Sequence, residues 1–81
     1  MQHLKGRIVV SKKGKDKGRF LVIVEDNCEI FVADGKLRPL EKPKKKNLKH
    51  LALTNSYLDE AQMATNRSLR KALEAFGTAK V

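Results

Sequence analysis

The sequence predicts a mainly β fold, in which a small closed β-barrel precedes a C-terminal α-helix. Five short apolar or β-branched runs lie within residues 1–54, and residues typical of tight turns separate them. Apolar residues recur at helical spacing only within residues 55–81. Because a flat sheet of this size would leave one face bare, we expect the strands to close into a barrel. The 81 residues therefore form one small unit, a barrel over residues 1–54 with a helical extension packed on it over residues 55–81.

The first two strands are predicted on either side of a loop that contains two glycines. Residues 6–11 are rich in β-branched side chains. Residues 20–24 are a dense apolar run, too short for a helix, and predict a central strand. The loop over residues 12–18 holds Gly14 and Gly18, which allow the backbone to turn sharply.

A third strand and a hairpin turn are expected next. Asp26 and Asn27 are turn residues, and residues 29–33 resume the strand pattern. Asp34 and Gly35 follow, and this pair is the strongest short-range signal for a hairpin because both positions tolerate positive φ.

The fourth and fifth strands are predicted around a run of lysines. Residues 37–40 predict a short edge strand, since Pro39 has no amide to donate. Residues 48–53 predict a last strand or turn. Residues 41–47 contain three consecutive lysines, whose repulsion predicts a loop that stays mobile until phosphates neutralise it. The alternative is a solvated loop that aids solubility.

The C-terminal third predicts a helix with two possible starts. Ser56 and Asp59 fit a capping box, Thr65 precedes a second start, and Gly77 is the expected C-cap. The pattern leaves open whether the helix is continuous from Tyr57 or broken near Thr65. The apolar stripe comprises Leu58, Ala61, Thr65, Leu69, Ala72, Leu73 and Phe76. We expect this stripe to pack on the barrel; the alternative is that it serves a partner protein.

Charge is sorted along the chain into two basic segments. Residues 1–19 hold seven Lys or Arg against one acid, and residues 36–50 again hold seven against one. Residues 20–35 hold four acids and no base. The two segments carry 14 of the 18 positive charges, so a fold that joins them has one strongly positive side. Such a side is expected of a protein that lies on a phosphate backbone.

The composition favours nucleic acid over other partners. The net charge is +9, which requires an abundant anionic partner. The basic segments lack the interleaved large apolar residues of an interfacial helix, and the apolar run over residues 20–24 is far too short to span a bilayer. We expect a reduced, cytoplasmic protein that binds no membrane and no small-molecule substrate.

Catalytic and metal sites are not predicted. Cys28 is the single cysteine, and the acids on either side of it do not activate a thiol, so we interpret it as a small strand residue. His3 and His50 are the two histidines, and no close pair of zinc ligands exists. We therefore expect a monomer without cofactor or metal that is not an enzyme. His50 lies next to the basic run and is a candidate phosphate or base contact.

The few aromatic residues restrict the mode of binding. Phe20 and Phe31 are predicted in the core, whereas Tyr57 and Phe76 belong to the predicted helix. Without an exposed aromatic pair, splayed single-stranded bases have no stacking platform. The binding mode that remains is recognition of folded RNA by its shape, through contacts with phosphates and 2′-hydroxyl groups.

Residues 6–24 resemble a KOW motif, which is found in ribosomal proteins and transcription elongation factors. The shared features are a strand, the loop Gly-Lys-Asp-Lys-Gly at residues 14–18, and a second strand. The sequence departs from the wider motif at Leu21, where another glycine is usual.

Residues 40–54 are similar to the basic segment, ending in hydrophobic-Lys-His-Leu, of the archaeal and eukaryotic large-subunit ribosomal protein L-fourteen-e family. Residues 69–73 are similar to the end of small bacterial KOW-containing RNA-binding proteins, found mainly in Firmicutes. The resemblance implies an SH3-like barrel and RNA binding, with ribosomal RNA as the natural target. It leaves open whether the protein is a ribosomal component or an accessory or assembly factor.

We therefore expect a protein that binds structured RNA through one basic face. The alternative is a protein-interaction module of the transcription or translation machinery. The candidate RNA-binding residues are Arg7, Lys12, Lys13, Gly14, Lys15, Lys17, Gly18, Arg19, Arg38, Lys42, Lys44, Lys45, Lys46, Lys49 and His50. Among them the arginines are candidates for forked phosphate contacts, and the lysines act as point charges.

Overall fold

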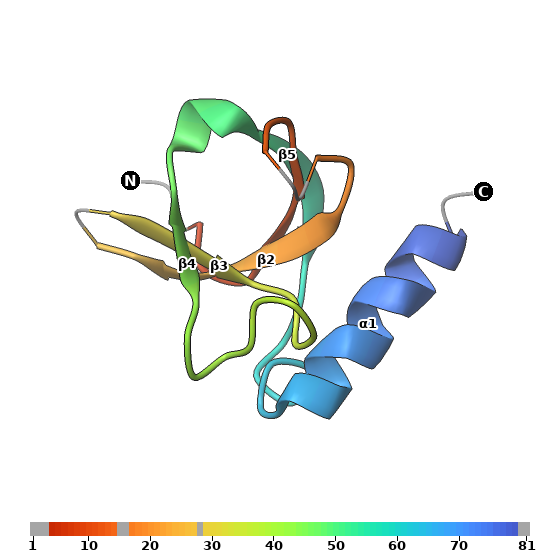
Figure 1. Cartoon of the computed structure of the whole chain (residues 1–81). Coiled ribbons are helices and arrows are strands. Elements are labelled where there is room, and N and C mark those ends of the chain that lie inside the picture. The colour runs from red at the N-terminus through yellow and green to blue at the C-terminus, as the bar shows by residue number, and fades with distance from the viewer. Residues whose placement is uncertain (1–3, 15–16, 28, 80–81) are drawn as a thin grey trace.

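A five-stranded antiparallel sheet and one C-terminal helix make up the fold (Figure 1). The computed structural model describes residues 4–14, 17–27 and 29–79. In chain order the elements are β1 (Arg7–Ser11), β2 (Phe20–Asp26), β3 (Ile30–Ala33), β4 (Lys44–Lys46), the 3-10 turn η1 (Leu48–His50), β5 (Leu51–Tyr57) and α1 (Asn66–Ala79). The predicted mainly β fold with a C-terminal helix is confirmed, and β2 is the central strand of the order β4-β3-β2-β1-β5.

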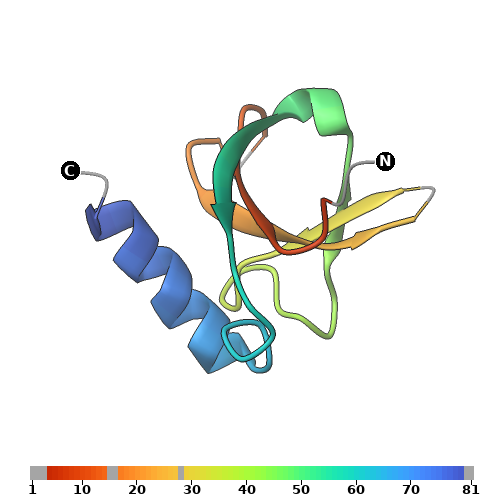
Figure 2. The same cartoon turned by 180° about the vertical axis from the view of Figure 1, so that it is seen from behind.

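The sheet curls strongly but does not close into the predicted barrel. Its two edges are β4 and β5, and η1 joins them without strand pairing among the described residues (Figures 1 and 2). The pairing register shifts once between β2 and β3 and once between β1 and β5. Such irregularities bend strands and increase twist, which accounts for the curl.

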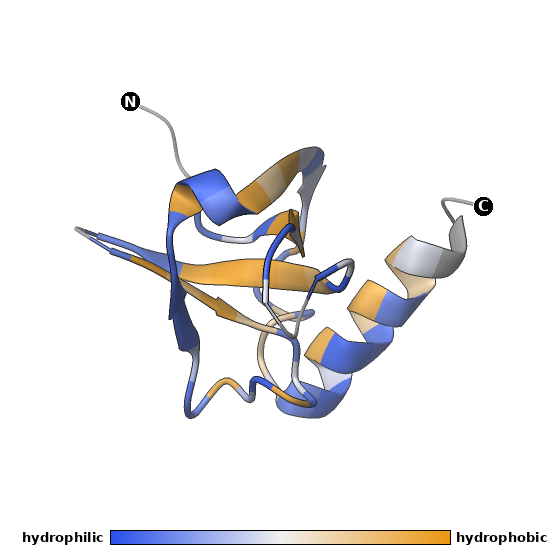
Figure 3. Cartoon of the chain, turned by 45° about the horizontal axis from the view of Figure 1, so that its top comes forward, coloured by the Kyte–Doolittle hydropathy of each residue, from blue (hydrophilic) through white to orange (hydrophobic). Residues whose placement is uncertain are grey.

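The curl buries both faces of the sheet. Under α1, the residues Ile8, Val22 and Ala33 form one row across three strands and pack against Leu69 and Leu73. The inner face carries a second cluster, which consists of Val9, Leu21, Ile23, Val32 and Leu51. Side chains alternate between these faces with the period of two that strands impose. In Figure 3 the middle of the sheet is hydrophobic, whereas β4 is hydrophilic throughout.

The helix is held at its first turn by the segment that follows β3. Gly35 has φ of +78°, and a Cβ atom at this position would overlap the carbonyl oxygen of Asn66. The Asn66 side chain accepts a hydrogen bond from the amide of Leu40 at 2.7 Å and donates one to Glu41 at 2.8 Å. The bond from Asn66 lowers the pKa of the Glu41 carboxyl below its usual value. Backbone packing and side-chain bonds thus locate the helix start.

The structure corrects the predicted edge strand over residues 37–40, which is part of a long connection between β3 and β4. The carboxylate of Asp34 is buried and accepts hydrogen bonds from the amides of Lys36 and Arg38, each at 2.8 Å. Because Asp34 and Asn66 take the amides of this segment, those amides are not available to a strand partner.

The predicted mobile lysine loop is also wrong, because Lys44–Lys46 forms β4 and pairs with β3. Edge strands accommodate charged side chains, which discourage pairing with other molecules. The Nζ atom of Lys45 forms an ion pair with Glu29 Oε2 at 2.8 Å, and this contact raises the pKa of Lys45. Pairing with β3 and this ion pair therefore order residues 44–46 without a bound phosphate.

The helix starts at the second of the two predicted positions. Ser56 and Tyr57 end β5, and the hydroxyl of Thr65 caps α1 by accepting from the amide of Ser68 at 3.1 Å. Gly77 lies inside α1 and is not the C-cap that the sequence suggested. A small residue is suitable there because a Cβ atom would lie 3.4 Å from the ring of Phe20.

We predict that Gly35→Ala destabilises the fold more than Gly18→Ala does. Both glycines have positive φ, which costs an alanine about 1–2 kcal/mol. At Gly18 no atom lies within 4 Å of a new Cβ, whereas at Gly35 the Asn66 carbonyl must move, adding roughly 1–3 kcal/mol. Urea unfolding of the two variants measures the difference. Equal losses would show that the contact between Gly35 and α1 does not stabilise the fold.

Candidate nucleic-acid interface

The two basic segments meet beside η1. The amide of Lys12 donates to the carbonyl oxygen of His50 at 2.8 Å. The Nζ atom of Lys46 donates to the Ser11 hydroxyl and to the Lys13 carbonyl, each at 3.3 Å. We name the resulting surface the basic junction, and it consists of Lys12, Lys13, Gly14, Lys46, Lys49 and His50.

The loop between β1 and β2 is held close to β1 by Ser11. The Ser11 side chain is buried, and its hydroxyl donates a hydrogen bond to the Lys13 carbonyl at 2.9 Å. The backbone carbonyl of Ser11 accepts a hydrogen bond from the amide of Gly18 at 2.8 Å. Gly14 has φ of +82°, and a Cβ there would lie 3.7 Å from Lys46 Nζ, an ordinary contact. Gly14 is therefore required for its backbone conformation and not for space. Lys15 lies outside the described residues.

The other half of the junction depends on η1. The side-chain oxygen of Asn47 accepts from the amide of Lys49 at 3.1 Å and so caps this short turn. Lys49 and His50 occupy its last positions. The turn thereby presents both residues next to the loop that carries Lys12 and Lys13.

His50 lies close enough to four lysines for their charges to affect its pKa. Partial burial and the neighbouring ammonium groups lower the pKa of the His50 imidazole below its ordinary value. The four contributing groups belong to both segments: Lys13, Lys49, Lys46 and Lys12. Like charges this close repel one another, and a bound anion would relieve that repulsion.

Lys45 points away from the junction although its neighbours in sequence are candidates as well. Successive side chains of β4 alternate between faces, so Lys44 and Lys46 share one side and Lys45 takes the other. There Lys45 pairs with Glu29, and both side chains remain more than half exposed. Lys42 is exposed in the connection before β4, and Lys17 and Gly18 are exposed in the loop before β2.

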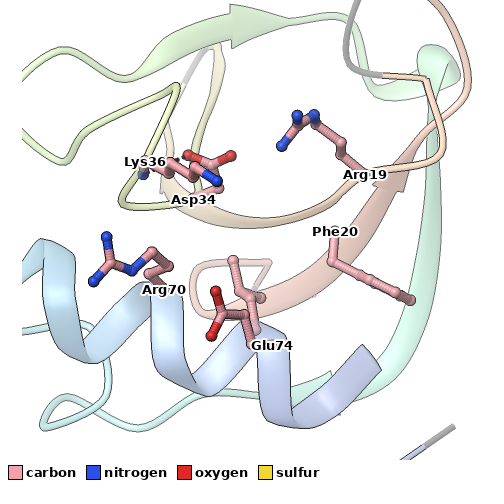
Figure 4. A pocket seen from close by; sticks show the side chains of 7 residues that line it. Arg19, Phe20, Asp34, Lys36, Arg70 and Glu74 are labelled. Carbon is pink, nitrogen blue, oxygen red and sulfur yellow. Dashed lines mark hydrogen bonds between the residues drawn. The ribbon is translucent and has the colours of Figure 1, made fainter. Parts of the chain in front are cut away.

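The three candidate arginines are not part of the basic junction. The guanidinium carbon of Arg7 lies 5.0 Å from the ring centroid of Tyr57, its cross-strand neighbour at the far end of β1. Arg38 belongs to the Asp34 turn. Arg19 borders a pocket beneath α1 (Figure 4).

Sequence reasoning missed Tyr57, which we had assigned to the helix. It ends β5 with about half of its surface exposed (51%), and Arg7 covers its ring. Residues 51–57 contain a usable signal, because large or polar residues alternate with small ones as in an exposed edge strand. Phe20 is half-buried and meets Phe76 edge-on, with ring centroids 5.2 Å apart.

No helix in the described part of the chain combines the length and apolar character needed to cross a membrane. Comparison with models of known protein families and with curated protein sequences gives no match for this chain.

We predict that the stability of the free protein falls as the pH is lowered through the titration range of histidine, from about 7.5 to about 5.5. Because the pKa of His50 is lower in the folded than in the unfolded state, the unfolded state takes up more protons in this range. His50→Gln should flatten this dependence, and added salt should weaken it by screening the lysines.

The measurement is urea unfolding across this pH range, together with an NMR titration of the His50 imidazole. Lys49→Gln provides the control, since removal of one ammonium group should raise the pKa of His50. An ordinary pKa for His50 in the wild-type protein would show that the lysines do not act on it.

Proposed function

We propose that this protein binds structured RNA through the basic junction, with ribosomal RNA as the target. The observation that carries the proposal is the contact of Lys46 with Ser11 and Lys13, which joins two basic segments more than thirty residues apart in the chain. Lysine ammonium groups and loop amides are the groups that bind phosphate oxygens in protein–RNA complexes. The net charge of +9 supports the same partner.

The junction suits recognition by shape. Its lysines act as point charges that neutralise phosphates without reading bases. Lys46 is held by two hydrogen bonds, so part of the entropy cost of ordering this side chain is met before RNA arrives. Phe20 and Phe76 pack against each other and are not available as a stacking platform.

We also propose that the fold is an SH3-like domain of the KOW type. The strand order, with the last strand beside the first, supports this, as does a 3-10 turn between β4 and β5. A basic loop bounded by Gly14 and Gly18, both with positive φ, lies between β1 and β2 and supports the same proposal. On this proposal the protein acts in the cytoplasm on the ribosome, as a component or during assembly.

A second candidate function is a protein-interaction module. The observation that favours it is the outer strand β5, which exposes Leu53 and Tyr57 at an unpaired sheet edge. Exposed apolar and aromatic residues are typical of protein interfaces, whose cores are depleted in lysine. Variants of Leu53 would impair such an interaction without changing RNA affinity.

We predict that Lys46→Ala weakens binding to a structured ribosomal RNA fragment by about tenfold, the loss expected for one charged hydrogen-bonded contact. The slope of log affinity against log salt should also shrink by just under one. Lys45→Ala is the matched control, because Lys45 lies on the same strand but faces Glu29. Filter binding over a salt series provides both quantities. Equal effects of the two variants would exclude the junction as the contact surface.

We predict a salt slope between about −4 and −7 for the wild-type protein, since the two segments together would neutralise about 6–8 phosphates. The same salt series measures it, with duplex RNA of unrelated sequence as the comparison. A slope shallower than about −2 contradicts a shared face.

A further inference from the structure

A second group of cations surrounds an open pocket of about 220 Å³ beneath α1 (Figure 4). Its lining residues are Arg19, Phe20, Asp34, Lys36, Arg70, Leu73 and Glu74. The cations come from three separate places: the end of the loop before β2, the turn after β3, and α1. The fold therefore brings together charges that no sequence segment holds together.

The cations of the pocket are not used by the fold. Among the described residues, the side chains of Arg19, Lys36 and Arg70 form no ion pair and no hydrogen bond. Figure 4 shows Arg70 and Arg19 on either side of Lys36 and Asp34, with the Arg70 side chain extending from α1. Three cations around one space repel one another, and an anion entering that space would be held from three sides.

The other residues that line the pocket restrict which chemical group can be attached to the bound anion. Phe20 and Leu73 give an apolar wall, and Glu74 adds a carboxylate one helical turn from Arg70. The carboxylate of Asp34 is occupied in part, because one of its oxygens accepts two backbone amides. At about 220 Å³ the pocket is smaller than the roughly 300 Å³ at which sites for drug-sized ligands begin, so it suits one small unit.

The pocket and the basic junction both adjoin Ser11, the last residue of β1. The carbonyl of Arg19 accepts a hydrogen bond from the amide of Ser11 at 3.1 Å. The hydroxyl of Ser11 in turn accepts from Lys46 Nζ. The residue at the end of β1 therefore contacts both the pocket wall and the junction.

We propose that this pocket binds one phosphate of an RNA strand together with the adjacent ribose. Arg19, Lys36 and Arg70 bind the phosphate oxygens, and the ribose lies against the apolar wall. Glu74 accepts a hydrogen bond from the ribose 2′-hydroxyl, which DNA lacks, so the pocket favours RNA over DNA. The inference rests on the proposed function and assigns α1 a part in recognition.

The first test compares Arg70→Gln with Lys71→Gln, two variants with the same loss of charge at neighbouring exposed positions of α1. Lys71 does not line this pocket. Arg70→Gln should weaken binding of an RNA hairpin by about tenfold and reduce the salt slope by just under one, as for one lost charged contact. Lys71→Gln should change affinity by less than about twofold. Equal effects overturn the proposal.

The second test measures discrimination with RNA and DNA hairpins of identical sequence. Glu74→Ala removes the acceptor and one negative charge, so DNA affinity should rise while RNA affinity changes little. The ratio of RNA to DNA affinity should fall at least about threefold, the loss of a weak hydrogen bond. An unchanged ratio overturns the role of Glu74.

Two further outcomes separate this inference from the proposed function. If Lys46→Ala impairs RNA binding but Arg70→Gln matches its control, the pocket fails while the junction stands. If the wild-type protein binds no RNA, both fail. Adenosine monophosphate, followed by NMR at the Arg70 side-chain NεH, distinguishes the source of the phosphate. Perturbation by the free nucleotide at lower concentration than by the RNA hairpin would overturn the assignment to a strand.

Discussion

The close approach between Gly35 and the first turn of α1 is the constraint on which the remaining structure depends. Because Gly35 has no side chain, the Asn66 carbonyl can lie against the turn, and the Asn66 side chain bonds to the segment that follows. This places Leu69 and Leu73 over the row of small and branched residues on the sheet. Without that cover one face of the five-stranded sheet would be exposed, which a chain of this size tolerates poorly.

The same arrangement places the helix where it can take part in binding. Docking through Gly35 places Arg70 in the wall of the same pocket as Lys36, from the turn after β3, and Arg19, from the loop before β2 (Figure 4). The helix therefore has two faces with different roles. Leu69 and Leu73 bury apolar surface, and Arg70 and Glu74 line a charged pocket. On the proposed function, packing and RNA recognition would use two faces of the same helix.

The basic junction illustrates a conflict between stability and binding. Partial burial and, after it, the neighbouring ammonium groups lower the pKa of the His50 imidazole, so like charges face one another in the free protein and a bound anion would offset their repulsion. Ser11 keeps the groups together in spite of that repulsion, since its buried side chain and backbone bond to the loop and to Lys46. The ion pair between Lys45 and Glu29 lies outside the junction.

Local pattern was sufficient to predict the first three strands and a C-terminal helix, although not which of its two possible starts is used, because periodicity and turn residues act over a few positions. It also showed that two basic segments flank an acidic one. The closed barrel, the strand over residues 37–40 and the mobile lysine loop were wrong. Two of these errors involve partners distant in sequence, because Asn66 bonds to residues 40 and 41 and β3 pairs with the lysines. Sequence by itself determined how much positive charge there is and on which segments. Only the tertiary structure decided which charges meet, because strand alternation turned Lys46 toward Lys13 and Lys45 toward Glu29, and helix docking brought Arg70 to Arg19.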